Sequence, residues 1–136
     1  MFEFMYKLSR KSVVMNKLLQ FVYKCEIPRT AQIGSGVTFN HKGLGVVIHP
    51  NSQIEDNVYI EHHVCLGQRT GTDTAAPVVR KNTVIGAYSV ILGGGIGEGC
   101  VIGACSLVLH DVPAHTIFYN ERIEKTKENH KPIGQY

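Results

Sequence analysis

The chain repeats an aliphatic or aromatic residue every six positions over most of its length. The repeat residues are Ile27, Ile33, Phe39, Ile48, Ile54, Ile60, Leu66, Val79, Ile85, Ile91, Ile96, Ile102 and Val108. A small residue follows nearly all of them four positions later: Ala31, Val37, Ser52, Val58, Val64, Thr83, Ser89, Cys100, Ser106 and Val112. An amphipathic helix repeats every 3.6 residues and a half-buried strand every 2, so neither produces this pattern. A six-residue period is typical of a solenoid of short parallel strands.

Three repeats form one triangular coil, in which the aliphatic residues point inward and the small residues turn the corners. Coils stack about 4.8 Å apart, and each coil buries its apolar residues only against its neighbours. Residues 27–112 are long enough for about five such coils. We therefore predict an all-β solenoid, a parallel β-helix over residues 25–117. An amphipathic helical segment at 1–24 precedes it, and a polar tail at 118–136 follows.

The six-residue period is interrupted at three points. The step between repeat residues is nine at Gly43–Gly45, thirteen at Gly67–Pro77 and five at Gly93–Gly95. The first two indicate insertions that leave the coil as loops, and glycine can absorb the deletion at the third. Loops that leave a rigid scaffold commonly carry function, so the two insertions mark the region to search for a site.

The first 24 residues hold the excess of positive charge in a chain of net charge +3, with five basic residues against Glu3: Lys7, Arg10, Lys11, Lys17 and Lys24. Two interpretations stay open. These helices cap the first coil, or they form a basic amphipathic segment that rests on an anionic membrane. The charges interrupt any run long enough to span a bilayer, and no signal-peptide cleavage site follows an apolar run. We expect a cytoplasmic protein, with peripheral contact at the inner membrane face under the second interpretation.

Cysteine spacing and glycine-rich segments exclude several classes of protein. Cys25, Cys65, Cys100 and Cys105 show no CxxC pair, which favours free thiols over a disulfide framework or a zinc site. Gly93–Gly95 lacks the Lys-Ser/Thr of a phosphate loop. No stripe of basic and aromatic residues indicates nucleic-acid binding.

Counting three repeats per coil predicts which residues stack, namely Phe39, Ile60, Ile85 and Ile102. Two residues further on, a second column runs along one corner: His41, His62, Ala87 and Ala104. A neutral imidazole is suited to general-base catalysis near pH 7. Two histidines one coil apart can also contribute to a metal site, but the sequence indicates no third ligand, so we expect no metal.

These residues resemble a known family. Glu26-Ile27-Pro28, Asn40–Ile48, Val64–Gly67, Ile85–Ala87 and Ile102–Ser106 are similar to segments of the hexapeptide-repeat acyltransferases, which are left-handed parallel β-helices. Within that family the chain looks most like serine O-acetyltransferase and its relatives in polysaccharide gene clusters. The resemblance implies acetyl transfer from acetyl-CoA to a small hydroxyl-bearing acceptor, in clefts between the subunits of a homotrimer.

The resemblance also implies roles for individual residues. His41 matches the catalytic histidine, and Glu26 matches the aspartate that orients it. Residues expected to bind the acceptor are Asn40, His62, His63 and Arg69, and those expected along the pantetheine arm of acetyl-CoA are Gly67, Ala87, Gly103 and Ala104. His62 is also an alternative candidate for the base.

Three departures from the family pattern bear on the acceptor. Asn40 replaces an acidic residue, Ala75-Ala76 replaces an Arg-His pair that engages serine, and Phe118–Glu121 replaces a Gly-x-Pro-Ala turn beside CoA. A site without its ion partner binds an amino-acid carboxylate poorly, which favours a sugar hydroxyl of a polysaccharide precursor over serine. A non-catalytic scaffold and a metal-dependent hydratase of the carbonic anhydrase kind are the remaining alternatives.

Overall fold

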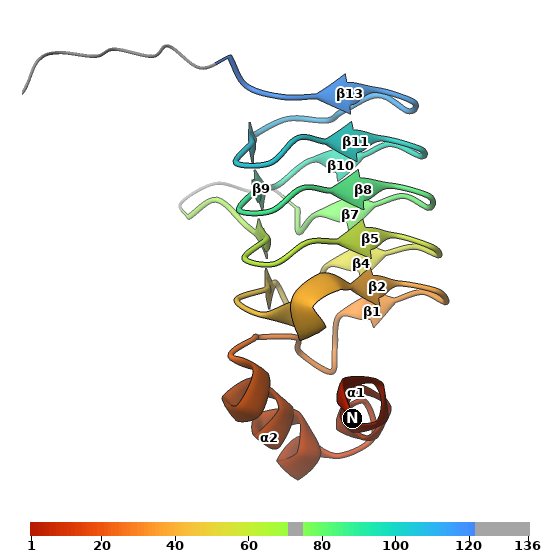
Figure 1. Ribbon diagram of the computed structural model, residues 1–136. Coiled ribbons are helices and arrows are strands. Elements are labelled where there is room, and N and C mark those ends of the chain that lie inside the picture. The colour runs from red at the N-terminus through yellow and green to blue at the C-terminus, as the bar shows by residue number, and fades with distance from the viewer. Residues whose placement is uncertain (71–74, 122–136) are drawn as a thin grey trace, which may run out of the picture.

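A computed structural model describes residues 1–70 and 75–121, which form two helices and a rod of stacked coils (Figure 1). The helices are α1 (Phe2–Ser9) and α2 (Val13–Tyr23), and a 3-10 turn, η1, spans Asn40–Gly43. The strands are β1 (Gln32–Ile33), β2 (Thr38–Phe39), β3 (Val47–Ile48), β4 (Gln53–Ile54), β5 (Tyr59–Ile60), β6 (Cys65–Gly67), β7 (Val78–Val79), β8 (Val84–Ile85), β9 (Val90–Leu92), β10 (Gly95–Ile96), β11 (Val101–Ile102), β12 (Leu107–Val108) and β13 (Ile117–Phe118).

The strands stack into three parallel sheets that form the sides of a triangular prism. Among the described residues the sheets hold four, five and four strands, in the orders β1-β4-β7-β10, β2-β5-β8-β11-β13 and β3-β6-β9-β12. The predicted parallel β-helix is confirmed. The coil count is slightly lower than expected, because two of the three sides are four strands deep rather than five.

Inward and outward side chains alternate within each short strand, as a pleated backbone requires. In β4, β5, β8 and β11 the first residue is exposed and the second is buried. The small residues that follow are buried at the corners, and the hydroxyls of Thr83, Ser89 and Ser106 bond to main-chain carbonyls. Thr83 Oγ1 donates to the Gly97 carbonyl at 2.9 Å, and Ser89 Oγ donates to the Gly103 carbonyl at 2.9 Å. The six-residue period therefore identifies both the buried core residues and the small residues at the corners.

The described interruptions of the period lie where the sequence indicated. The insertion at Gly43–Gly45 becomes η1 and the turn after it. The short step beyond β9 is absorbed by Gly93 and Gly94, which have φ angles of 77° and 84°. The long insertion at Gly67–Pro77 includes residues 71–74, and the predicted tail at 118–136 runs past residue 121, so both lie partly outside the described residues.

The two helices pack on the first coil at one end of the rod (Figure 1). Phe2 and Leu19 join the buried core. The Arg10 guanidinium donates to the carbonyls of Pro28 (2.7 Å) and Ala31 (2.6 Å), and Asn16 Nδ2 donates to the Ile27 carbonyl at 2.9 Å. These bonds satisfy carbonyls that would otherwise be left exposed at the edge of the solenoid.

The four cysteines are free thiols, as the sequence indicated. Burial raises the pKa of the Cys25 thiol to about 11, which suppresses the reactive thiolate at neutral pH. This cysteine therefore acts as an apolar core residue.

The alternation of inward and outward residues predicts unequal costs for neighbouring substitutions in β4. Ile54 is 2% exposed, so Ile54→Ala should lower the free energy of unfolding by about 2–5 kcal/mol. Gln53 is exposed, and Gln53→Ala should change it by less than about 0.5 kcal/mol. Urea titration of both variants measures the difference, and equal costs would contradict the inward orientation of Ile54.

Candidate active site

The register between coils brings His41 and His62 together at one corner. Phe39 pairs with Ile60, so the histidines two residues further along stack one coil apart. Their ring centroids are 4.8 Å apart and the rings meet edge to face at 81°. The pairing of β5 with β8 and of β8 with β11 continues the same corner to Ala87 and Ala104. The column predicted by counting repeats is therefore present.

The inserted turn holds His41 in a left-handed backbone conformation. His41 and Lys42 have φ angles of 47° and 60°, and Gly43 and Gly45 have 70° and 68°. The same corner of the next coil needs only His63 in this conformation, with φ 55°. Other corners of the rod also hold a residue in this conformation, such as Asn57, Asn82 and Cys105, so the inserted turn differs from them in having two such residues in succession, His41 and Lys42. The extra turn leaves the His41 side chain exposed to solvent.

A carboxylate that sequence reasoning missed lies beside both imidazoles. Asn40 Nδ2 donates to both carboxylate oxygens of Glu61 at 2.9 Å, and Glu61 Oε2 lies 3.5 Å from His62 Nδ1. The Asn40 hydrogen bond, with smaller contributions from His62 and His41, lowers the pKa of Glu61 below its ordinary value, although desolvation opposes the shift. Glu61 is therefore ionised at neutral pH next to the histidine pair.

Tyr88 covers the other side of the histidine pair and was also missed. Its ring stacks on His63 at 4.6 Å with an interplanar angle of 7°, and it meets His62 edge to face at 5.3 Å. The Nδ1 atoms of His62 and His63 are buried without a hydrogen-bond partner. The 3.5 Å contact to Glu61 is too long to satisfy His62 fully. Buried polar atoms of this kind call for a ligand or a water molecule, which marks this corner as a binding site.

Glu26, which was expected to orient His41, lies in the neighbouring sheet. Its backbone forms a bridge with Val47, which pairs with Cys65 in β6. Burial and the charge of Glu26 together raise the pKa of the Cys65 thiol. No hydrogen bond joins Glu26 to His41 among the residues that the structure describes. Glu61 is the carboxylate that the fold brings to the histidines.

The residues expected to contact acetyl-CoA continue this corner along the rod. Gly86 lies so close to the next coil that a Cβ there would be 2.6 Å from the Ala104 nitrogen. Ala87 is half-buried and Ala104 is exposed, so small side chains leave the main chain of the corner accessible. Gly67 pairs with Leu92 at the end of β6, and a Cβ on Gly103 would be 3.3 Å from Tyr119 Cβ.

The remaining residues that the sequence singled out lie within the long insertion, before and after residues 71–74. Arg69 is exposed after β6. Ala75 and Ala76 follow residues 71–74, which lie outside the described part of the chain.

His41, Glu61 and His62 also offer the three metal donors that the sequence did not indicate. Their potential ligand atoms lie within 4.8 Å of one another. Imidazole and carboxylate suit divalent transition metals, but zinc bonds of about 2.0–2.1 Å require ligand atoms roughly 3.4 Å apart in a tetrahedral site. The side chains would have to move to close on an ion, so the observed spacing fits a hydrogen-bonding site better.

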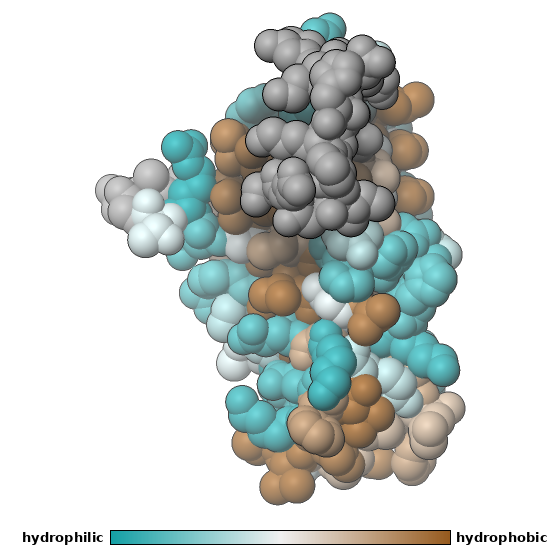
Figure 2. Space-filling view, turned by 60° about the vertical axis from the view of Figure 1, so that its left-hand side comes forward, coloured by the Kyte–Doolittle hydropathy of each residue, from teal (hydrophilic) through white to brown (hydrophobic). Residues whose placement is uncertain are grey.

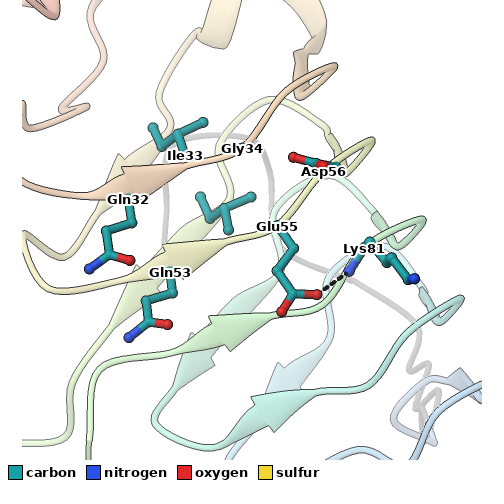
Figure 3. A pocket seen from close by; sticks show the side chains of 8 residues that line it. Gln32, Ile33, Gly34, Gln53, Glu55, Asp56 and Lys81 are labelled. Carbon is teal, nitrogen blue, oxygen red and sulfur yellow. Dashed lines mark hydrogen bonds between the residues drawn. The ribbon is translucent and has the colours of Figure 1, made fainter.

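A separate hollow of about 490 Å³ lies on the side of the prism formed by β1, β4, β7 and β10 (Figure 3). Gln32, Gln53, Glu55 and Lys81 line it, with Ile33, Gly34, Ile54 and Asp56 completing the wall. Both of its carboxylates are already engaged: Glu55 accepts bonds from the Arg80 guanidinium (2.6 Å) and the Lys81 main-chain nitrogen (3.0 Å), and Asp56 accepts one from the Ser35 main-chain nitrogen (2.7 Å). This arrangement stabilises the surface of the rod and leaves the histidine corner as the candidate site.

The fold and this corner define the class of molecule as a hexapeptide-repeat solenoid, a parallel β-helix of three stacked sheets. No protein-family model matches the chain. The serine acetyltransferase of Buchnera aphidicola subsp. Schizaphis graminum is 35% identical over 131 residues, which are 91% of this chain and 49% of that protein. Soybean serine acetyltransferase complexed with serine has a TM-score of 0.69 and 38% identity, covering 76% of this chain and 44% of that one.

A solved structure with coenzyme A belongs to the same group. The serine acetyltransferase of Brucella abortus strain S19 in complex with coenzyme A has a TM-score of 0.67 and 33% identity, covering 83% of this chain and 46% of that one. The chain spans about half the length of the Buchnera relative. By sequence and by fold, it resembles the serine O-acetyltransferases, as the sequence motifs indicated.

Gly43 and Gly45 in the inserted turn share a left-handed backbone conformation, but alanine substitutions at the two positions should have different effects on the histidine corner. A Cβ on Gly45 would lie 2.7 Å from Nε2 of His63, whereas a Cβ on Gly43 would have its nearest neighbours at 3.6 Å. Both variants to alanine should lose about 1–3 kcal/mol of stability from the left-handed φ. Only Gly45→Ala should also displace the His63 ring from Tyr88, which a histidine NMR spectrum detects. Equal spectra for the two variants would contradict the packing of Gly45 on His63.

The lowered pKa of Glu61 predicts a pH dependence of stability. Because the native pKa lies below the unfolded value, the Asn40–Glu61 bond contributes fully above the ordinary glutamate range and is lost as pH falls through the native pKa. Asn40→Ala should therefore cost about 0.5–1.5 kcal/mol at pH 7 and progressively less below about pH 4. Asn57→Ala, which breaks a neutral amide contact to Asn82, is the control. The loss of unfolding free energy in Asn57→Ala should not vary with pH. A loss in Asn40→Ala that is equally independent of pH would show that the Asn40 hydrogen bond is not coupled to the ionisation of Glu61.

Proposed function

We propose that the protein is an acetyl-CoA-dependent O-acetyltransferase that acts on a small acceptor through the histidine corner. The observation that carries the proposal is the stacked pair His41–His62 beside an ionised Glu61, on a solenoid that resembles the serine acetyltransferases. One of these relatives has been solved with serine, and another with coenzyme A, which acetyl transfer releases.

In the proposed reaction His41 acts as the general base. Its imidazole takes the proton of the acceptor hydroxyl while the oxygen attacks the thioester carbonyl of acetyl-CoA. The new O–C bond forms, the C–S bond breaks, and the leaving CoA thiolate takes the proton back from the imidazolium. A base of this kind contributes about 10²–10⁴-fold to the rate. The exposure of His41 fits a group that meets two substrates from solution.

Glu61 is the carboxylate that we expect to stabilise the imidazolium. It is held ionised mainly by Asn40, and both histidines lie close enough to influence its pKa. His62, edge to face with His41, separates the base from Tyr88 and fits a ligand for the acceptor. Asn40 then acts through Glu61 as a positioning residue. This role explains why an amide side chain precedes His41, where the family resemblance implies an acidic residue.

Acetyl-CoA is expected to run along the corner beyond the histidines. Ala87 and Ala104 leave room for the pantetheine arm, and Gly67 and Gly103, both half-buried, are the further contacts that we expect for it. A thioester that approaches along this corner reaches His41 with little rearrangement, and such positioning supplies much of the rate enhancement.

A homotrimer with the corner in the cleft between subunits completes the proposal. The two sides that meet at the corner carry apolar residues facing outward: Tyr59, Val84, Val101 and Ile117 on one side, and Val47 and Leu107 on the other. Rows of exposed apolar side chains on adjacent faces suit association of parallel rods around a threefold axis.

Serine is the acceptor that the relatives favour, rather than the sugar hydroxyl expected from the sequence. The sugar stays a second candidate on one observation: Ala75-Ala76 stands where the family resemblance implies an Arg-His pair that engages serine. A sugar hydroxyl needs no such cation, and a site lacking an ion partner discriminates against a charged substrate.

A direct assay separates these possibilities. Purified protein is given acetyl-CoA with L-serine, and in parallel with neutral sugars, amino sugars and nucleotide sugars, while release of free CoA thiol is followed. Serine-dependent release supports the serine acetyltransferase function, and release with sugars alone supports the second candidate. If acetyl-CoA neither binds nor reacts with any acceptor, the enzyme proposal fails and a scaffold role replaces it.

Substitutions at the corner test the assigned roles. His41→Asn, chosen because asparagine tolerates the left-handed φ, should lower kcat about 10²–10⁴-fold. Glu61→Gln should lower it about tenfold to a hundredfold, the range expected for a hydrogen bond to a charged group. Glu26→Gln is the matched control and should retain nearly full kcat. A larger loss of kcat in Glu26→Gln than in Glu61→Gln would assign the orienting role to Glu26. Full activity of His41→Asn would identify His62 as the base.

A further inference from the structure

The solvent-facing side of α2 is almost entirely apolar. Its exposed residues are Val13, Val14, Lys17, Leu18, Phe21 and Val22, whereas Asn16 and Leu19 face the rod. Val14 is 76% exposed and Phe21 is 71% exposed. A surface helix normally shows the opposite pattern, with polar residues outward and apolar residues inward. The outward face of α2 therefore needs an apolar environment that a single chain in water does not provide.

Helix α1 extends this apolar surface at the same end of the rod. Phe4 is 67% exposed and Leu8 is 37% exposed. We call this surface the end face, defined by Phe4, Leu8, Val13, Val14, Leu18, Phe21 and Val22. Figure 2 shows hydrophobic side chains gathered over the helical end of the molecule, with hydrophilic ones bordering them. Exposed apolar patches of this kind mark sites of association with a protein or a membrane.

Lysines surround the end face and define its electrostatic character. Lys7, Lys11, Lys17 and Lys24 are all exposed, and Lys24 Nζ lies 4.3 Å from the centroid of the Phe21 ring. Glu3 is the sole acidic residue among the first 24. The end face therefore combines large apolar side chains with a clear excess of positive charge.

We propose that the end face binds the surface of an anionic membrane. Amphipathic helices with Phe and Leu on one face and Lys around it bury their apolar side chains at the headgroup boundary, and anionic lipids attract the lysines. A second copy of the chain is a poorer partner, since a twofold contact would bring the lysines of both copies together. In the part of the chain that the structure describes, neither helix has the length and apolar character of a membrane span.

This orientation brings the histidine corner close to the lipid. A Cβ on Gly43 would be 3.6 Å from Phe2 Cζ, and the Gly45 nitrogen donates to the Lys24 carbonyl at 2.9 Å, so the inserted turn rests on the helices. The inserted turn that carries His41 therefore belongs to the coil nearest the proposed membrane surface.

Vesicle sedimentation with the full chain tests the proposal without using enzymatic activity. Vesicles of phosphatidylcholine with 30% phosphatidylserine are compared with vesicles of phosphatidylcholine alone. We expect binding to the anionic vesicles at least about tenfold tighter, and weaker at 0.5 M than at 0.1 M salt. Equal affinity for both vesicles, or no binding to either, would overturn the proposal, whatever the outcome of the acetylation assay.

Variants at exposed positions identify the binding surface. The triple change Val14→Ser, Leu18→Ser and Phe21→Ser should weaken vesicle binding more than about tenfold, and Lys17→Gln about fivefold. Leu109→Ser and Lys81→Gln, exposed positions on the rod, are matched controls and should bind as the unchanged chain does. Circular dichroism melting verifies that each variant is folded.

Sedimentation equilibrium without vesicles measures whether the end face serves self-association instead. If the triple variant lowers the molecular mass while vesicle binding stays unchanged, the end face contacts another copy of the chain, and the membrane proposal is wrong. An unchanged mass together with lost vesicle binding supports it.

Discussion

The register between successive coils is the constraint on which the rest of this structure depends. Each short strand buries one side chain, and that side chain stacks on its counterpart in the next coil, as Phe39 does on Ile60 and Ile60 on Ile85. A slip of one residue would turn every buried aliphatic outward, so the register is strongly specified. This stacking determines which residues are neighbours at each corner, including His41, His62 and the alanines beyond them.

The candidate site uses this register together with one local departure from it. The insertion after β2 holds His41 and Lys42 in left-handed conformations and leaves the His41 imidazole exposed. Directly before it, Asn40 faces Glu61 in the next coil. Two carboxylates at these positions would repel each other and raise the pKa of one of them, whereas an amide donates to the carboxylate and keeps it charged. Asn40 and Glu61 are therefore best understood as a pair.

The sequence predicted features that follow from the period and missed those that depend on side-chain direction. The stacking of His41, His62, Ala87 and Ala104 required only counting, because one register applies to every coil. Glu61 went unnoticed because its importance comes from its contacts with Asn40 and His62, which the period does not encode. Tyr88 was missed for a related reason: its left-handed φ of 59° turns the ring toward the histidines. Counting repeats placed Glu26 near the correct corner, but it did not show that Glu26 lies in the neighbouring sheet.

The stacking of the histidines below the alanines has a consequence for how such a site can change over time. Along the rod, the distance between a group on one coil and a group on another is fixed in whole coils of about 4.8 Å. Duplication of one complete coil between His62 and Ala87 would preserve the core and every corner while moving the two parts of the site apart by one such step. Loss of a coil would shorten the distance equally. A solenoid of this kind can therefore adjust to donors or acceptors of different length in discrete increments, without redesign of its interior.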